Sequence, residues 1–388
     1  MTVKIKKKQL GQFFTTNSDY ILSGFEEFIK GKKVSDPFAG AGDLLRWAEN
    51  NKARRAIGFD VDKKYVDEKN VLFQDTLISA GKYDFVITNP PYLNVNKADK
   101  KTKEKYFKNS GLEDLYHLSL RAIMNSNEGI VIVPINFLSA RNSKKIREIF
   151  FSKFRIVEMN YFKQQVFPDT TYNVIAFYYK KKENQFDDEF SIKTHIYPEG
   201  KCVAIELNKN HDWAIGGKIF KTIKKQENFL GVKRLTEKDV ANKKGKIKIR
   251  AAYNHVKHMR EFTISEDVYR KIKSNIILLK AIDSGSKSGR IALENIRNYG
   301  VDCLVSKESS RHMIYLILDK KVTIIEQEKL IDLFNLEINK LRENYLSLFL
   351  TNYRDNDRKR IGFDFVYKFI NYLYFHNLHY AKGQSALF

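Results

Sequence analysis

The sequence predicts an α/β protein whose first half forms a doubly wound, mostly parallel sheet, followed by a second domain of mixed helices and strands. Two observations lead to this prediction. Short apolar runs alternate with helical stretches between residues 32 and 181, and the charged segment KKKENQFDDEF at 180–190 then interrupts this rhythm. Strands that alternate with helices are typical of parallel sheets with helices on both faces.

Seven segments of the first half have the length and apolar composition of buried strands. They span residues 32–37, 54–60, 70–75, 83–89, 129–134, 154–160 and 172–181. Apolar side chains at helical spacing occur between them, at residues 42–50, 113–126 and 143–154. We therefore expect a seven-stranded sheet in a domain that covers residues 1–190.

Residues 191–388 are expected to form the second domain, because a chain of 388 residues is long enough for two. Residues 326–350 and 364–378 have the pattern of amphipathic helices. The segment KKGKIKIR at 243–250 alternates like a strand with one cationic face, and RDNDRKR at 354–360 is a second basic cluster.

The chain is strongly basic, with 69 Lys and Arg against 46 Asp and Glu, a net charge of +23. Such an excess suggests a polyanionic partner, most often nucleic acid, although a merely Lys-rich composition is the alternative. Two cysteines, Cys202 and Cys303, are too few for a disulfide framework or a zinc site of several thiolates. The sequence shows neither a signal peptide nor an apolar run that could span a bilayer, so we expect a cytoplasmic protein.

A glycine-rich turn joins the first predicted strand to a helix in VSDPFAGAGDLL, residues 34–45. Gly40 and Gly42 allow a tight turn and the close approach of a ligand, although a purely structural turn is the alternative. Asp36 ends the strand, and a carboxylate there would repel a pyrophosphate. It would suit a cationic ligand, such as the methionine part of S-adenosylmethionine.

Two further carboxylates end the next two predicted strands. Asp60 lies twenty residues after Gly40, where nucleotide-binding α/β folds place an acceptor for ribose hydroxyls. Asp75, at the end of the third strand, is placed to accept a hydrogen bond from an adenine amino group. The alternatives are a helix cap at Asp60, a role that suits Asp62 better, and a simple turn residue at Asp75.

The segment TNPPY, residues 88–92, follows the apolar run DFVI. Its two prolines end the strand and restrict the backbone, so they hold Asn89 and Tyr92 stiffly just beyond the strand end. A structural strand terminator is the alternative reading of this motif.

The segments LGQFFTT, DPFAGAG, GFDVD, FQD and TNPPY occur in this order within the first 180 residues. In this order they resemble the gamma-class adenine-specific DNA methyltransferases of restriction-modification systems, which contain an Asn-Pro-Pro-Tyr motif. The resemblance implies a Rossmann-like, S-adenosylmethionine-binding catalytic domain at 1–190 and a target recognition domain at 191–388. It also implies methyl transfer from S-adenosylmethionine to the N6 amino group of a flipped-out adenine in double-stranded DNA.

The resemblance assigns roles to individual residues of this sequence. The side-chain oxygen of Asn89 and the carbonyl of Pro90 would accept hydrogen bonds from the adenine amino group, which makes its nitrogen more nucleophilic. Tyr92 would stack on the flipped base. Phe167, in a VFP turn, would lie on the base's other face, with core packing as the alternative.

The implied cofactor-binding residues include Thr15, from GQFFTT, in which Thr16 stands where the family has proline. The full set is Thr15, Asp36, Phe38, Gly40, Gly42, Asp60, Asp75, Asn89 and Pro91. No metal is expected.

Related activities use the same Asn-Pro-Pro-Tyr motif. The alternatives are methylation of an RNA amino group, methylation of a protein glutamine, and a non-catalytic DNA-binding protein. A glutamine methyltransferase would carry its extra domain before the cofactor motifs, whereas about two hundred residues follow them here. We expect a monomer that acts on double-stranded DNA, with any cognate restriction endonuclease as a separate protein.

Overall fold

The chain, in a computed structural model, forms two compact units. The first extends to Gly217 and the second begins at Lys218, except that Arg354 belongs with the first. The structure describes residues 15, 17–167, 172–184, 186–224, 229–241, 245–283, 289–354 and 358–379. The division falls later than residue 190, because strands beyond that position join the first sheet.

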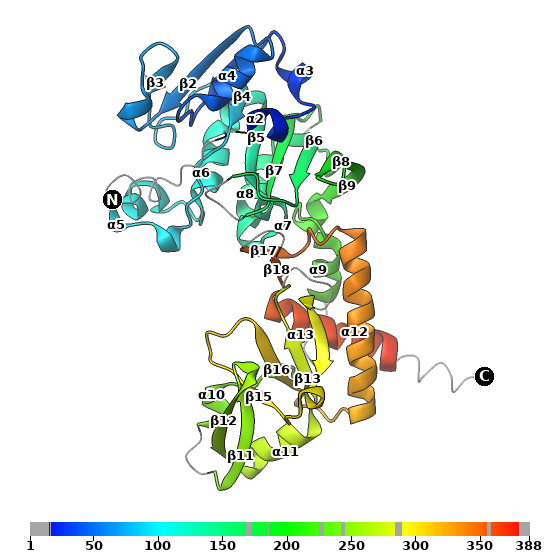
Figure 1. Ribbon diagram of the computed structural model, residues 1–388. Coiled ribbons are helices and arrows are strands. Elements are labelled where there is room, and N and C mark those ends of the chain that lie inside the picture. The colour runs from blue at the N-terminus through cyan, green and yellow to red at the C-terminus, as the bar shows by residue number, and fades with distance from the viewer. Residues whose placement is uncertain are drawn as a thin grey trace, which may run out of the picture. The chain divides into compact units, whose positions relative to one another are not determined.

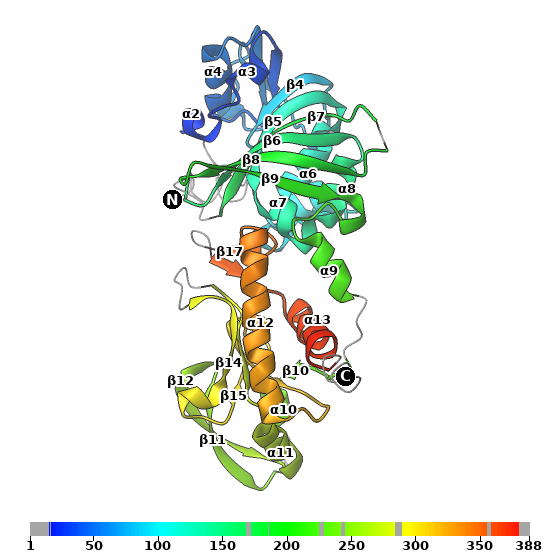
Figure 2. The same ribbon diagram turned by 90° about the vertical axis from the view of Figure 1, so that its right-hand side faces the viewer.

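A nine-stranded sheet forms the centre of the first unit (Figure 1). Its strands are β1 (Lys33–Asp36), β2 (Arg55–Asp60), β3 (Val71–Phe73), β4 (Tyr83–Thr88), β5 (Ser126–Pro134), β6 (Phe154–Phe162), β7 (Val174–Lys181), β8 (Glu189–Tyr197) and β9 (Lys201–Asn208). Their order is β3-β2-β1-β4-β5-β7-β6-β8-β9, and Figure 2 shows β4 to β9 side by side. Five of the eight neighbouring pairs are parallel, so the sheet is mostly parallel.

All seven expected strands are present, but the expected number was wrong because β8 and β9 extend the sheet. Side chains of β8 alternate between exposed and buried, which is the pattern of a strand with one face on a core. β8 pairs in parallel with β6, and β9 pairs antiparallel with β8. The charged segment at 180–190 therefore precedes a hairpin of the same sheet.

Helices cover both faces of this sheet (Figures 1 and 2). The helices of the first unit are α2 (Ser18–Ile21), α3 (Glu26–Ile29), α4 (Asp43–Asn50), α5 (Lys100–Thr102), α6 (Leu115–Ala122), α7 (Asn136–Ser139) and α8 (Lys144–Phe151). Ile130 and Ile132 of β5 belong to a buried cluster with residues of α2, α3 and α4. On the other face, Phe177 of β7 packs against Phe137 of α7 and Phe150 of α8. The predicted doubly wound arrangement is thus present.

The connection from β3 to β4 reverses the direction in which strands are added. β1 has β2 on one side and β4 on the other, and all three are parallel. The carboxyl ends of β1 to β4 therefore lie at one edge of the sheet. In open α/β sheets, ligands bind in the crevice outside the carboxyl ends at such a reversal.

The second unit combines small sheets with helices. The remaining strands are β10 (Lys233–Arg234), β11 (Ile247–Tyr253), β12 (His255–Ile264), β13 (Ile277–Lys280), β14 (Ala292–Asn295), β15 (Leu304–Val305), β16 (Met313–Ile317), β17 (Thr351–Arg354) and β18 (Arg358–Arg360). The remaining helices are α9 (Gly217–Lys224), α10 (Glu237–Val240), α11 (Glu266–Ser274), α12 (Ile324–Asn344) and α13 (Phe363–Leu373). They form a four-stranded sheet, β10-β16-β13-β14, a three-stranded sheet, β12-β11-β15, and the pair β17-β18.

The long helix α12 begins at a capping box, in which Thr323 and Glu326 bond each other's backbone N–H groups. Its buried residues Leu330, Phe334 and Ile338 recur every four positions, so they form one apolar stripe. The stripe packs into a core that includes β13, β16 and α13. Within the described parts of the chain, no helix combines the length and the apolar character needed to cross a membrane.

Candidate active site at the carboxyl ends of the parallel strands

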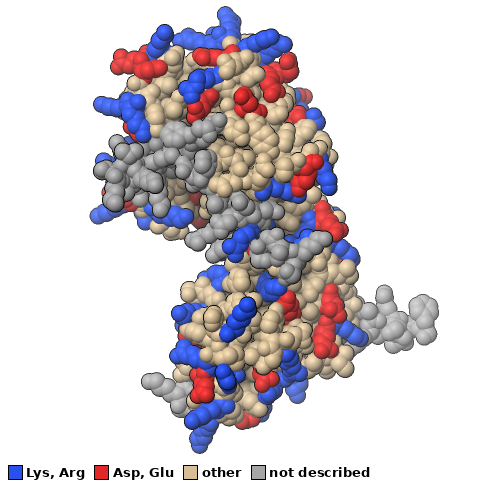
Figure 3. Space-filling view, viewed as in Figure 1, with Lys and Arg blue, Asp and Glu red and all other residues tan. Residues whose placement is uncertain are grey.

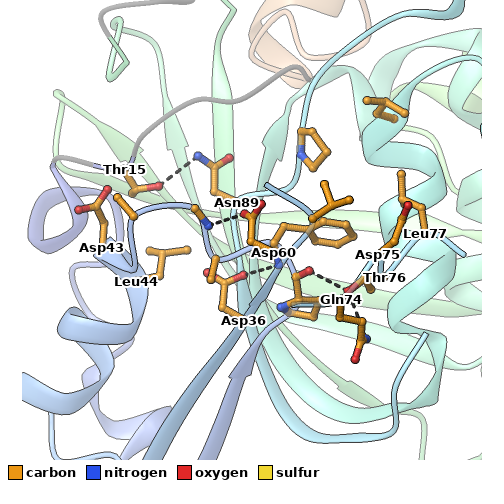
Figure 4. Close-up of a pocket in the computed structure, with 18 of the residues that line it drawn as sticks. Thr15, Asp36, Asp43, Leu44, Asp60, Gln74, Asp75, Thr76, Leu77 and Asn89 are labelled. Atoms are coloured by element: carbon orange, nitrogen blue, oxygen red, sulfur yellow. Dashed lines mark hydrogen bonds between the residues drawn. The ribbon is translucent and has the colours of Figure 1, made fainter. Parts of the chain in front are cut away.

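A pocket opens at the carboxyl ends of β1, β2 and β4 (Figure 4). It contains about 830 Å³ of empty space, part of it open to solvent. The lining residues are Thr15, Asp36, Pro37, Phe38, Ala39, Gly40, Ala41, Asp43, Leu44, Asp60, Val61, Gln74, Asp75, Thr76, Leu77, Asn89, Pro91, Tyr106 and Leu115. Loops that follow four different strands thus converge on one cavity.

The glycine-rich turn after β1 forms one wall of the pocket. Gly40 and Gly42 both have positive φ angles, of 52° and 76°, which side chains other than glycine rarely adopt. Gly58 of β2 lies beneath this turn, and a Cβ atom there would approach the Cβ of Ala39 to 2.5 Å. The turn can therefore rest directly on β2. Gly42 does not line the pocket; it lies at the residue before α4, which begins at Asp43.

Asp36 is almost completely buried at the end of β1. Its Oδ1 atom accepts hydrogen bonds from the backbone N–H of Phe38 at 3.0 Å and from Thr88 Oγ1 at 2.8 Å. Burial nevertheless raises the pKa of Asp36 to about 7, because the charged form loses its hydration. This carboxyl group is thus close to its titration point at neutral pH.

Asp60, at the end of β2, ties two loops together. One carboxylate oxygen accepts from the Gly40 N–H at 2.8 Å and the other from the Asp62 N–H at 2.7 Å. Burial raises the pKa of this carboxyl group, while the two backbone hydrogen bonds oppose the shift. Asp62 accepts a bond from the Lys64 N–H and so has the capping role that the sequence assigned to it.

Asp75 follows β3 and is held by two residues that the sequence analysis did not single out. Its Oδ2 atom accepts from the Tyr106 hydroxyl at 2.9 Å and pairs with Lys105 Nζ at 2.7 Å. Both residues belong to the short π-helix Lys103–Phe107, and Tyr106 also lines the pocket. Their segment, KKTKEKYF, has the composition of a solvated surface, so the sequence holds no signal for this contact.

Asn89, the first residue after β4, is buried and connects the pocket to Tyr92. Its Nδ2 atom donates to Thr15 Oγ1 at 3.1 Å, and its Oδ1 atom accepts from the Tyr92 hydroxyl at 2.6 Å (Figure 4 shows the Thr15 contact). The Tyr92 hydroxyl also lies 2.8 Å from the carbonyl oxygen of Ile132. These bonds orient the amide, with its oxygen toward Tyr92.

Tyr92 and Pro90 lie beside the pocket rather than in its wall. The Tyr92 ring is half-buried and packs edge-on against Tyr116, with the ring centroids 6.1 Å apart. Burial raises the pKa of the Tyr92 hydroxyl well above its usual value, so the group stays protonated. Pro90 is buried, and its carbonyl oxygen accepts no hydrogen bond from the described residues.

Phe167 does not reach this pocket. Its side chain is 2% exposed and belongs to the core cluster with Val166, Val174 and residues of α2 and α3. The structure thus buries Phe167 in the core, and its assignment to the other face of the base stays a prediction. Of the LGQFFTT motif, only Thr15 lies within the described residues.

The charged residues that line the pocket are all acidic. Asp36, Asp43, Asp60 and Asp75 contribute carboxylates, while no Lys, Arg or His is among the described residues that line it. Asp43 and Asp75 are paired with Arg46 and Lys105, whose side chains lie outside the lining. Such a cavity disfavours a phosphate-bearing ligand and favours one with a positive charge and several hydrogen-bond donors.

Residues 2–167 match the family described as Eco57I restriction-modification methylase. No curated protein matches the sequence.

Several solved structures are similar over part of the chain. The type IIL restriction-modification enzyme MmeI in complex with DNA aligns at 12% identity and a TM-score of 0.44, covering 82% of this chain and 60% of its own. The type IIG restriction endonuclease BpuSI aligns at 14% identity and a TM-score of 0.39, covering 60% of this chain and 37% of its own.

The type I methyltransferase subunit from Streptococcus thermophilus aligns at 15% identity and a TM-score of 0.34, covering 50% of this chain and 49% of its own. This chain thus spans less than two thirds of the length of each of the three structures. The first 167 residues match a restriction-modification methylase domain, and the rest of the chain lies outside that match.

Proposed function

We propose that the protein is a site-specific DNA methyltransferase that transfers a methyl group from S-adenosylmethionine to the N6 amino group of adenine. One observation carries the proposal. An Asn-Pro-Pro-Tyr turn at residues 89–92, whose first two residues are buried, adjoins a pocket lined by four carboxylates and by no described cation. The methylase match over residues 2–167 supports the same reaction class.

The residues of the pocket fit S-adenosylmethionine. This cofactor carries a methyl group on a positively charged sulfonium, which makes the methyl group reactive toward a weak nucleophile. In this proposal Asp36 would accept from its ammonium group, Asp60 from its ribose hydroxyls and Asp75 from its adenine amino group. The apolar residues Phe38, Leu77 and Leu115 offer surfaces for the flat base.

Asn89 and Pro90 would act on the substrate amino group. The Oδ1 atom of Asn89 has two lone pairs, so it can accept from the substrate while the Tyr92 hydroxyl occupies one of them. The Pro90 carbonyl supplies a second acceptor. Two acceptors draw the amino nitrogen away from conjugation with the ring and direct its lone pair toward the methyl group, so catalysis here is placement and electrostatics.

The base must leave the duplex to reach these acceptors. The half-buried Tyr92 ring lies next to Asn89 and offers a face on which the base would stack. The edge-on contact with Tyr116 and the bond to Ile132 fix that ring in place. Phe167, buried in the core, would require a local rearrangement to form the opposite face.

The charge of the chain supports a nucleic-acid substrate. Lys and Arg side chains cover more of the face in Figure 3 than acidic side chains do, consistent with the net charge of +23. An RNA amino group would be recognised by the same turn, so RNA is the competing substrate.

The decisive experiment is incubation with methyl-labelled S-adenosylmethionine and either plasmid DNA or total RNA. We expect label in DNA only, present as N6-methyladenine at one short recurring sequence when modified bases are mapped. Label in RNA, in protein or in cytosine would contradict the proposal.

Replacing Asp60 by Ala should weaken binding of S-adenosylmethionine and of its demethylated product. A hydrogen bond to a charged group contributes roughly 1.5–3 kcal/mol, so we expect the Kd to rise about 10- to 150-fold in calorimetry. Asp62→Ala, which removes a neighbouring carboxylate outside the pocket, serves as the control and should leave the Kd unchanged. Unchanged affinity in Asp60→Ala would remove Asp60 from the cofactor site.

A further inference from the structure

The β11–β12 hairpin of the second unit carries a cationic outer face, which we call the ribbon face. Lys248 lies opposite Thr263 and Arg250 opposite Glu261 in the strand register. Met259 lies opposite Ala252 on the same face, and Lys246 lies two residues before Lys248, just ahead of β11. The pairing shifts after Ala252, but Val256 of β12 packs against the core as Phe262 does, so Lys257 is assigned to the outer face. The ribbon face is therefore formed by Lys246, Lys248, Arg250, Lys257, Met259, Glu261 and Thr263, and its four cations are all exposed.

The opposite face of the hairpin is anchored. Ile247, Ile249 and Phe262 pack against a core cluster that contains Ala251 and Ile264. The third strand, β15, pairs only with Ala252 and Tyr253, so the part of the hairpin before Ala252 is a two-stranded ribbon. Figure 1 shows β11 and β12 side by side next to α11. A packed core thus lies behind the ribbon face.

The cations of the ribbon face are not neutralised by ion pairs. Lys246, Lys248, Arg250 and Lys257 form no ion pair with any described residue. By contrast, Arg260 on the anchored face lies 3.6 Å from Glu237 and stacks 5.0 Å from the Tyr253 ring centroid. Unpaired like charges on one strand face repel one another, so this surface is better suited to an anionic partner than to water alone.

We propose that the ribbon face enters the major groove of the target duplex; this rests on the proposed function. The groove of B-DNA is roughly 12 Å wide and admits a two-stranded ribbon, whose strands lie about 4.8 Å apart. From Lys246 to Arg250 the ribbon extends roughly 14 Å, which matches about four base steps. The deep, narrow major groove of an RNA duplex excludes such a ribbon.

The central pair of the ribbon face reads bases and its flanks bind phosphates. Arg250 suits the O6 and N7 acceptors of guanine, and a glutamate accepts from the N4 amino group of cytosine. Glu261 lies opposite Arg250. A glutamate would repel phosphates, so its presence on this face favours contact with bases at the Arg250–Glu261 pair. Lys246, Lys248 and Lys257, which surround this pair, are left for phosphate oxygens.

The first test compares two double variants of equal charge change. Lys248→Glu with Lys257→Glu alters the ribbon face, and Lys321→Glu with Lys329→Glu alters exposed lysines that form no ion pair with the described residues. The probe is a short duplex with the methylated site mapped for the wild-type protein. We expect the ribbon variant to bind the duplex at least tenfold more weakly, and the control variant less than threefold more weakly. In the ribbon variant the slope of log K against log salt concentration should also become shallower by about two, one for each lost phosphate contact. Unchanged product binding and unfolding temperature show that both variants are folded.

The second test locates the contact. Duplexes premodified at guanine N7 should bind the wild type weakly when the modified guanine lies in the read positions. Arg250→Ala should bind the intact duplex more weakly than the wild type does. Modification of N7 at one guanine should cause no further loss in this variant, because Arg250 no longer contacts that guanine.

Equal losses in the two double variants, or an unchanged interference pattern in Arg250→Ala, would overturn the ribbon proposal even if the wild type methylates adenine in DNA. A wild type that methylates RNA and binds no duplex would overturn the proposed function as well.

Discussion

Asn89→Ala should slow methyl transfer about 100- to 1,000-fold while leaving cofactor binding nearly intact. The Asn89 amide is buried at the end of β4, with Nδ2 bonded to Thr15 and Oδ1 to Tyr92, so its oxygen is held in one orientation. We propose that this oxygen binds the amino group more strongly in the transition state of methyl transfer than in the bound substrate. Removing one preorganised group of this kind costs roughly 10²–10³ in rate, and single-turnover methylation of a duplex would measure the loss.

The control for Asn89→Ala is Asn96→Ala, an exposed asparagine in the same loop that should retain full activity. Product binding by calorimetry should change little in either variant. Turnover within tenfold of the wild type in Asn89→Ala would show that the amide oxygen does not take part in the reaction.

Tyr92→Phe should retain much of the activity that Tyr92→Ala loses. The hydroxyl bonds Asn89 and Ile132 but has a single proton, so its removal costs one hydrogen bond of about 0.5–1.5 kcal/mol, or less than about 15-fold in rate. The ring face, which would stack on the base, accounts for roughly 1–3 kcal/mol more. The measurement is single-turnover methylation with 2-aminopurine fluorescence as the report of base unstacking. If the two variants are equally inactive, the hydroxyl has a role beyond orienting Asn89.

Much of the pocket could be located from the sequence because its polar residues directly follow predicted strands. Asp36, Asp60, Asp75 and Asn89 each follow an apolar run, and parallel strands bring their carboxyl ends to one edge. The helix periodicity of residues 143–154 and 326–350 was equally informative, because α8 and α12 each bury one stripe. These features depend on local patterns that one stretch of sequence contains.

What the sequence could not predict depends on contacts between distant segments. Tyr106 and Lys105 reach Asp75 across thirty residues, and nothing in their basic segment marks them as pocket residues. β8 and β9 were assigned to the second domain because the charges at 180–190 resemble a linker, whereas long-range pairing with β6 decides their place. Phe167 shows the same limit, since a short VFP turn is compatible with both a stacking site and a core.

Asp36→Asn should make the protein more stable at alkaline pH and less able to bind its cofactor. Burial holds the pKa of Asp36 at about 7, above its value of 3.8 in an unfolded chain. A group whose pKa is raised by folding stabilises the fold below the lower value and loses that contribution as the pH rises through the higher one. At about 1.4 kcal/mol per pKa unit, the ionised carboxylate costs the wild type roughly 4 kcal/mol at pH 9. Asn cannot ionise, so the unfolding free energy of Asp36→Asn relative to that of the wild type should rise between about pH 4 and pH 7 and stay constant at higher pH.

Cofactor affinity should increase with pH, whereas the Asp36 contribution to stability decreases. The reason is that the ionised carboxylate of Asp36 is the form that attracts an ammonium group. Wild-type affinity should therefore rise with pH up to about 7 and then level off, whereas Asp36→Asn should bind weakly with no such rise. Denaturant unfolding and calorimetry over the same pH series measure both effects. Asp43→Asn is the control, since Asp43 lines the same pocket but is already paired with Arg46. A wild-type affinity that is flat from pH 5 to pH 9 would exclude Asp36 as the group that binds the ammonium. A gain in stability without any loss of affinity in Asp36→Asn would make the buried carboxyl group purely structural.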